Sequence, residues 1–219
     1  MKNYLPLSGF QHNRRKFLKS QAILGLSALA GTMGSSKLFA TALESNSVNV
    51  DSFEAMRETY LECLGGSFPA STPLNTQIDK SMQKEGYRIL YLSYEAQPGD
   101  RIPALLLIPD SASADRPVPG IAVWHQHNGE YHLGKSEPAG LAGNPMHHTA
   151  VGLAHEGFVV LCPDALCFEE RQDPTGILKD GEYERFEFLR QIVKGRSLAW
   201  KSILDMKRAI DLLGERPEV

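Results

Sequence analysis

Two short runs of uninterrupted apolar residues constrain the fold most strongly. Residues 120–124 read GIAVW, and residues 158–162 read FVVLC. Strands without polar alternation are typical of sheets that are covered on both faces. Between them we expect a helix from about Met146 to His155, ended by Gly157 in a left-handed cap. The order strand, helix, strand predicts parallel pairing.

The neighbouring segments extend this pattern. Residues 87–95 and 102–108 are rich in β-forming side chains and are joined by QPGD, which predicts an antiparallel hairpin. Towards the C-terminus, apolar residues at helical spacing predict an amphipathic helix that begins near Leu198 and ends before Pro217. The expected class is therefore α/β, with an N-terminal antiparallel hairpin followed by a mostly parallel sheet.

The first 42 residues are typical of an export signal. Residues 14–19 read RRKFLK, the pattern of twin-arginine signals, and a short apolar run at 22–30 follows. A membrane span needs about 20 apolar residues, and this run is shorter and contains Gly and Ser. We expect recognition by the twin-arginine export machinery, removal of residues 1–42, a periplasmic or otherwise exported location, and no stable membrane anchor.

The remaining chain suits one domain. Residues 43–86 are polar, apart from a weak helical stretch at 53–64, and form a lead-in to a domain at 87–219. Without the signal, 17 Lys and Arg face 26 Asp and Glu, a net charge of −9, which disfavours nucleic acid as a partner. The cysteines fit no metal-ligand spacing, and we expect three free thiols: Cys63, Cys162 and Cys167.

Four segments carry a resemblance to a known family. They are RIPALLLIP at 101–109, HQHNG at 125–129, GFVV with PDA at 157–165, and DMKRAIDLL with RPEV at 205–219. Together they resemble the α/β-hydrolases of the dienelactone hydrolase and acetyl xylan esterase kind, in their exported bacterial branch. The resemblance covers residues 87–219. It implies an α/β-hydrolase-type, mostly parallel sheet with an N-terminal hairpin, incomplete at the C-terminus.

The resemblance also implies a reaction. These enzymes cleave carboxylic esters with a Ser-acid-His triad, whose Ser lies on a G-x-S-x-G turn directly after a strand. The sequence ends before that strand, so we expect no catalytic residue in this chain and an inactive N-terminal fragment. The implied substrate is a small-molecule or carbohydrate ester, with acylated sugars as one class, and no cofactor is implied.

Part of the active-site rim is expected within the chain. By family position, the backbone N–H of Gln126 or His127 is the candidate oxyanion donor, and His125 is a structural rim residue at the strand end. Glu170 and Arg171 occupy a stretch that shapes the pocket wall in such enzymes. Their alternative interpretation is a solvated charged loop.

A second motif suggests a different function. Residues 129–136, GEYHLGKS, match the phosphate-binding P-loop of NTPases. That loop needs a helix beginning at its Lys and Ser so that N–H groups converge on phosphate. Pro138, Gly140, Gly143 and Pro145 oppose such a helix. We therefore favour a long loop over an NTPase site.

Two further patterns are weaker than they look. Five histidines between His125 and His148 suggest zinc, but no H-x-x-x-H pair occurs, and we expect no metal. Ser197, in GRSLA, approximates a nucleophile turn, but the residues before it are too polar for a strand, which favours a helix N-cap. A non-catalytic exported binding protein remains the alternative to a hydrolase fragment.

Overall fold

The computed structural model describes residues 50–219. The expected twin-arginine signal at 1–42 and the start of the lead-in lie outside the described residues. The chain divides into two units, Met1–Phe53 and Glu54–Val219, and the sheet and the candidate site belong to the second. Within the described part, no helix has the length and apolar character needed to cross a membrane.

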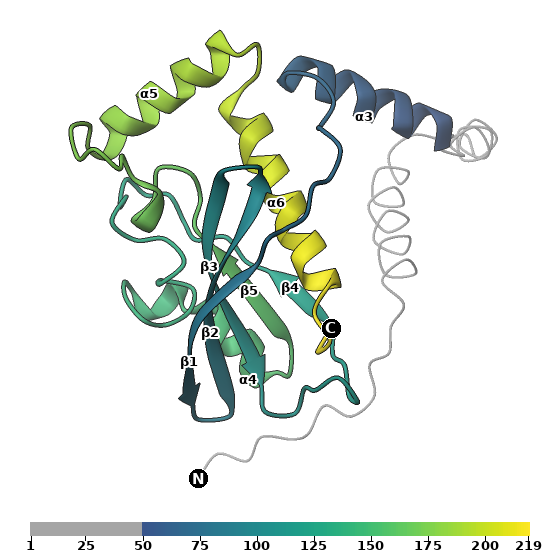
Figure 1. The fold of residues 1–219 in the computed structure, drawn as a ribbon, viewed down its shortest axis with the longest axis vertical. Coiled ribbons are helices and arrows are strands. Elements are labelled where there is room, and N and C mark those ends of the chain that lie inside the picture. Colours follow the sequence, from purple (N-terminus) through teal and green to yellow (C-terminus); the bar gives the residue numbers. More distant parts are fainter. Residues whose placement is uncertain (1–49) are drawn as a thin grey trace, which may run out of the picture. The chain divides into compact units, whose positions relative to one another are not determined.

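One five-stranded sheet organises the second unit (Figure 1). Its strands run in the spatial order β1-β2-β3-β5-β4. Their bounds are β1 Gln77–Lys84, β2 Tyr87–Gln97, β3 Asp100–Pro109, β4 Gly120–Ala122 and β5 Val159–Pro163. The mixed α/β class and the β2–β3 hairpin are confirmed.

The balance of strand directions differs from the expectation of a mostly parallel sheet. Only β4 and β5 pair in parallel, whereas β1–β2, β2–β3 and β3–β5 are antiparallel. The physical reason is the connection length, because parallel neighbours need a crossover. Among the strands described, only β4 and β5 are linked by a crossover connection, which contains helix α4 (Thr149–His155).

Strand β1 was not predicted. Its sequence, QIDKSMQK, is polar, and nearly all its side chains are exposed, so it shows no alternation of buried and exposed residues. It forms an edge of the sheet, paired only with β2, where hydrogen bonding rather than side-chain burial holds it. The sheet therefore begins at Gln77, earlier than the expected domain start at residue 87.

The helices match the sequence in part. Helix α3 (Val50–Leu64) covers the weak helical stretch expected at 53–64, and helix α6 (Leu198–Gly214) lies where helical spacing predicted it. Ser197 caps α6, because its Oγ accepts a hydrogen bond from the N–H of Trp200 at 3.0 Å. Helix α5 (Asp180–Val193) was not predicted. Short 3-10 turns occupy Pro145–His147 and Glu169–Arg171.

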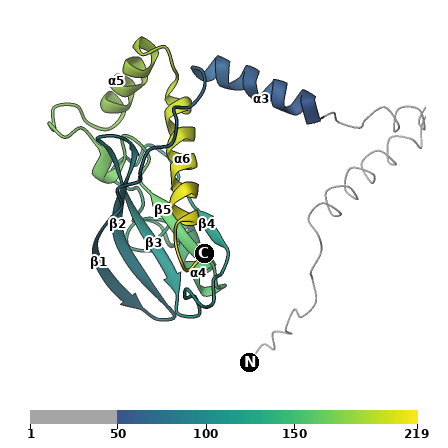
Figure 2. The same cartoon turned by 45° about the vertical axis from the view of Figure 1, so that its right-hand side comes forward.

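Both faces of the sheet are covered. On one face, Leu106 and Ile108 pack with residues such as Leu212 of α6, which runs beside β4 (Figure 2). On the other face, Leu105 and Leu107 pack with α4. Apolar residues on successive positions of β3 thus serve two cores, as expected of a strand covered on both sides. All three cysteines are free thiols, and Cys162 is buried in the second core.

Candidate functional site

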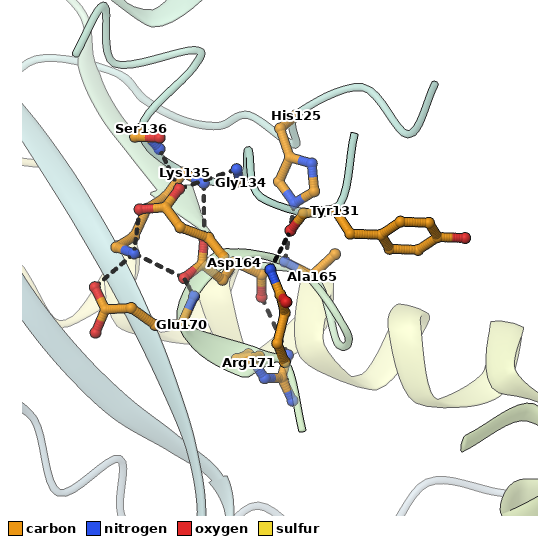
Figure 3. Close-up of polar contacts among 11 residues, drawn as sticks. His125, Tyr131, Gly134, Lys135, Ser136, Asp164, Ala165, Glu170 and Arg171 are labelled. Carbon is orange, nitrogen blue, oxygen red and sulfur yellow. Dashed lines mark hydrogen bonds and ion pairs between the residues drawn. The ribbon is translucent and has the colours of Figure 1, made fainter. Parts of the chain in front are cut away.

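The loop after β4 is fixed by His125. Its Nε2 accepts a hydrogen bond from the N–H of Ala165 at 3.1 Å (Figure 3). Its Nδ1 lies 2.9 Å from the carbonyl oxygen of Gln126. Nδ1 must then donate to Gln126, which defines a neutral imidazole. Burial agrees with this state, because it lowers the pKa of His125. His125 therefore ties this loop to the loop after β5.

The next two residues present free donors. Within residues 50–219, the backbone N–H groups of Gln126 and His127 donate no hydrogen bond. The side chain of Gln126 is turned to Glu130, with 3.0 Å between Nε2 and Oε2. Two successive N–H groups of this kind can stabilise an anionic oxygen.

The ring of His127 is held by helix α5 and by aromatic neighbours. Its Nε2 lies 2.9 Å from Glu184 Oε1, and Tyr131 donates its hydroxyl to Glu184 Oε2 at 2.6 Å. The rings of Tyr131 and Phe168 lie 5.3 and 5.1 Å from that of His127. The loop is thus braced from two sides, although the side chain of His127 remains 55% exposed.

A cluster of charged side chains around Lys135 lies beside this loop. Lys135 Nζ lies 2.8 Å from Asp164 Oδ2, 2.8 Å from Glu169 Oε1 and 2.7 Å from Glu170 Oε1 (Figure 3). The backbone N–H of Lys135 also donates to Asp164 Oδ1 at 2.7 Å. Lys135 therefore joins the loop after β4 to the residues that follow β5.

Burial and charge act in opposite directions within this cluster. Burial would lower the pKa of Lys135, but the attraction of Asp164 and hydrogen bonds to the carboxylates raise it above its ordinary value. Burial raises the pKa of Asp164 to about 6, in spite of the opposing attraction of Lys135. The 2.8 Å between Lys135 Nζ and Asp164 Oδ2 is the distance of an ion pair.

The same contacts decide the P-loop hypothesis. The N–H groups of Gly134 and Ser136 donate to Glu169 Oε2 at 2.9 and 3.0 Å, and Lys135 is already neutralised. Residues 135–140 form turns and not a helix, as Pro138 predicted. The N–H groups that would bind a phosphate already donate to the carboxylate of Glu169, so this segment is not a phosphate-binding loop.

Glu170 and Arg171 have different surroundings. Glu170 is 62% exposed and lines a cavity of about 350 Å³, together with Lys135, Arg101 and Tyr91. Arg171 is buried and lies 2.8 Å from Asp205 Oδ2 of α6. Of the three predicted rim residues, His125, Glu170 and Arg171, Glu170 lines this cavity, whereas Arg171 forms a buried ion pair with Asp205.

The histidines do not gather around one point. His147 Nδ1 lies 3.0 Å from Glu137 Oε1, and His148 Nε2 lies 3.1 Å from the carbonyl oxygen of Ala142. Among the described residues, one group of three potential metal ligands occurs, and it contains no histidine: Asp164, Glu169 and Glu170. Each of these carboxylates pairs with Lys135, whose ammonium group already supplies the cation.

Sequence reasoning missed the buried carboxylates of this region. Glu137 is 1% exposed, and hydrogen bonds from His147 and from the N–H of Asn144 hold its pKa below the ordinary value, although burial alone would raise it. Asp164 and Glu169 are likewise anchors and not solvated charges. The only available signal was the position of Asp164 directly after an apolar strand, where functional side chains gather in α/β sheets.

The fold is mixed α/β, and it matches the fold of a solved structure. The structure of a candidate acetyl xylan esterase from Bacteroides fragilis superposes with a TM-score of 0.61 at 18% identity, over 77% of this chain and 44% of that one. Identity this low shows a shared fold and not a shared activity. The chain spans less than half the length of that structure.

Two further esterase structures superpose less well. An acetyl xylan esterase from Paenibacillus sp. R4 matches with a TM-score of 0.44 at 18% identity, over 80% of this chain and 49% of that one. A glucuronoyl esterase from Solibacter usitatus matches with a TM-score of 0.41 at 14% identity, over 78% and 50%. No protein-family model matches the sequence, and no curated protein matches it.

Proposed function

We propose that residues 77–219 form the N-terminal part of a serine α/β-hydrolase that cleaves carboxylic esters. The carrying observation is the pair of unbonded N–H groups at Gln126 and His127, on the loop after β4 of an esterase-like fold. Attack on an ester carbonyl generates an oxyanion, and preorganised N–H donors stabilise it. One of these two groups is the donor of this half of the site.

The braces around the loop support this role. The bond from Ala165 to His125 and the contact between His127 and Glu184 connect the loop to two other segments of the chain. A donor contributes to catalysis only if it is already aligned when charge develops. A loop held in this way does not need to reorganise during the reaction.

The outer side of β4 supports the proposed arrangement of the nucleophile. Strand β4 ends the sheet order, and beside it lies an apolar groove of about 530 Å³. The groove is lined by residues including Ile121, Trp124, Met206, Ile210 and Val219. In the proposed enzyme, a further strand pairs with β4, fills this groove and carries the G-x-S-x-G turn to the oxyanion donors. The acid and the His of the triad belong to the same later segment.

The test begins with the DNA that follows codon 219. We expect G-x-S-x-G within about 20 codons in one reading frame. The longer product should hydrolyse p-nitrophenyl acetate, and replacement of that Ser by Ala should abolish hydrolysis. The 219-residue chain should show only background hydrolysis, unaffected by Ser197→Ala. Hydrolysis by the 219-residue chain that is lost with Ser197→Ala would refute the proposed arrangement.

A further inference from the structure

The carboxylate of Glu184, on helix α5, binds two residues that follow β4. Its Oε1 lies 2.9 Å from His127 Nε2, and its Oε2 accepts a hydrogen bond from the hydroxyl of Tyr131 at 2.6 Å. The two partners are 57 and 53 positions away in the sequence. A carboxylate that binds two donors at once restricts the positions of both.

Charge strengthens these contacts. Burial would raise the pKa of Glu184, but hydrogen bonds from Tyr131 and His127 hold it below the ordinary value, so the group is ionised at neutral pH. The hydrogen bond to Glu184 raises the pKa of Tyr131 to about 12, so the phenol keeps its proton. Hydrogen bonds to an ionised acceptor are shorter and stronger than those between neutral groups.

The contacts of His127 define its tautomer. The backbone N–H of Gly129 donates to Nδ1 at 3.3 Å, so Nδ1 is the acceptor and Nε2 carries the proton that it donates to Glu184. The ring therefore connects α5 to the N–H two residues further along its own loop. Without Glu184 the ring can rotate and release Gly129.

The segment that the ring holds is a tight turn. The N–H of Glu130 donates to the carbonyl oxygen of His127 at 3.0 Å, and φ is +35° at Asn128 and +72° at Gly129. Positive φ at both central residues is typical of a type I′ turn. This conformation costs Asn more than it costs Gly, so it persists only where surrounding contacts hold it.

The peptide group that carries the N–H of His127 is fixed at its other end. His125 Nδ1 donates to the carbonyl oxygen of Gln126 at 2.9 Å. The C=O and N–H of one planar trans peptide point in opposite directions, so this bond also orients the N–H of His127. The N–H of His127 thus has a fixed peptide plane before it and a ring held by Glu184 after it.

We propose that Glu184 is a positioning residue: through the ring of His127 it holds the turn at residues 127–130 and thereby the direction of the His127 N–H. The inference rests on the proposed function, in which this N–H is one of the two candidate oxyanion donors. Glu184 does not touch the substrate. It contributes because a donor that is aligned beforehand needs no reorganisation when the oxyanion forms.

Amide hydrogen exchange in the 219-residue protein, measured by NMR, tests the positioning. Glu184→Ala should speed exchange at Gly129 about tenfold, because the ring of His127 no longer holds this N–H. Exchange at Leu106, in the core strand β3, should stay unchanged. Glu182→Ala, at an exposed position of the same helix, is the matched control and should change neither. Unchanged exchange at Gly129 in Glu184→Ala, or equal acceleration at Leu106, would overturn the proposal.

A double-mutant cycle tests whether Glu184 acts through His127. His127→Phe keeps an aromatic ring and the backbone N–H but removes both hydrogen bonds of the imidazole. It should speed exchange at Gly129 by the same factor as Glu184→Ala, and adding Glu184→Ala to it should have no further effect. Further acceleration in the double variant would show that Glu184 acts by another route, and the proposal would be rejected.

Ester hydrolysis by the proposed longer product supplies a separate readout. Glu184→Ala should lower kcat about tenfold and leave KM nearly unchanged, because the oxyanion develops only towards the transition state. Glu182→Ala should leave both constants unchanged. Faster exchange at Gly129 with an unchanged kcat would contradict the oxyanion role of this loop, whereas unchanged exchange would contradict the role of Glu184. The two failures are therefore distinguishable.

Discussion

Lys135 Nζ lies 2.8 Å from Asp164 Oδ2, and both side chains are almost wholly buried, at 4% and 0% exposure. The pair joins a loop that follows β4 to the end of β5. Burying two charges carries a desolvation cost that their mutual attraction offsets, whereas either charge buried alone is very unfavourable. The pair thus makes the loops around the candidate site depend on each other.

Lys135→Met should strongly destabilise the fold. The change leaves Asp164 buried without its counter-charge, which should lower the free energy of unfolding by about 3–5 kcal/mol. Urea denaturation at constant protein concentration measures it. Lys207→Met is the control, because its ion pair with Asp211 is exposed and should contribute at most about 1 kcal/mol. Equal losses in the two variants would contradict the importance of the buried pair.

His125 should make stability depend on pH. Burial lowers the pKa of His125 in the folded protein below 6.5, the ordinary value, which applies to the unfolded chain. Between the folded and the unfolded pKa, the unfolded chain therefore binds the proton more readily than the folded one. Its contribution to the free energy of unfolding is therefore complete above about pH 6.5 and is lost as the pH falls towards the folded pKa. Urea denaturation at several pH values between about 7.5 and 5, which bracket the ordinary pKa of about 6.5, measures how steeply the free energy of unfolding changes with pH.

Two variants isolate this effect. His125→Gln cannot titrate, so stability should fall less steeply with decreasing pH than in the unsubstituted protein. His132→Gln, at an exposed position, should leave the slope unchanged. Parallel pH profiles for all three proteins would show that protonation of His125 is not coupled to unfolding.

Two glycines should respond oppositely to alanine. A Cβ at Gly134 would overlap Asp164 Oδ1 and lie 2.8 Å from Glu169 Cβ, so Gly134→Ala should cost about 1–3 kcal/mol of stability. A Cβ at Gly152, within α4, meets nothing within 4 Å, and Gly152→Ala should stabilise the fold by up to about 1 kcal/mol. Thermal unfolding measures both, and a stabilising Gly134→Ala would contradict the close packing at the Lys135 cluster.

Export through the twin-arginine route remains a proposal, carried by RRKFLK at residues 14–19. Arg14→Lys with Arg15→Lys should hold the protein inside the cell with its first 42 residues attached. Cell fractionation and intact mass measure the outcome. Lys37→Arg, beyond the apolar run, should leave export unaffected. Continued export of the double variant would exclude this route.

The hairpin and helix α6 could be predicted because each shows its own periodicity. Apolar and β-branched residues mark β2 and β3, and Leu198 begins a helical stripe after the capping Ser197. The candidate loop could also be placed, because His125–Gly129 follows an apolar strand. Which N–H groups lack acceptors depends on Ala165 and α5, distant along the chain, and needed the structure.

The role of Lys135 was hidden by a local match. In GEYHLGKS it looked like a phosphate-binding lysine, and only the position of Asp164 and Glu169 beside it revealed an ion-pair cluster. Helix α5 escaped prediction because its apolar side chains face outward and Glu187 and Gln191 face inward. A helix of this kind does not show the expected apolar face towards its own core.

The sequence by itself determined four strands and the last helix, because a residue pattern facing a core is written locally, at a spacing of two or 3.6 residues. Only the tertiary structure decided the recruitment of β1, the mostly antiparallel sheet, the partners of Lys135 and the outward apolar side of α5. These features arise from contacts between residues far apart in the chain, whose free energies of burial and charge pairing depend on the assembled surroundings.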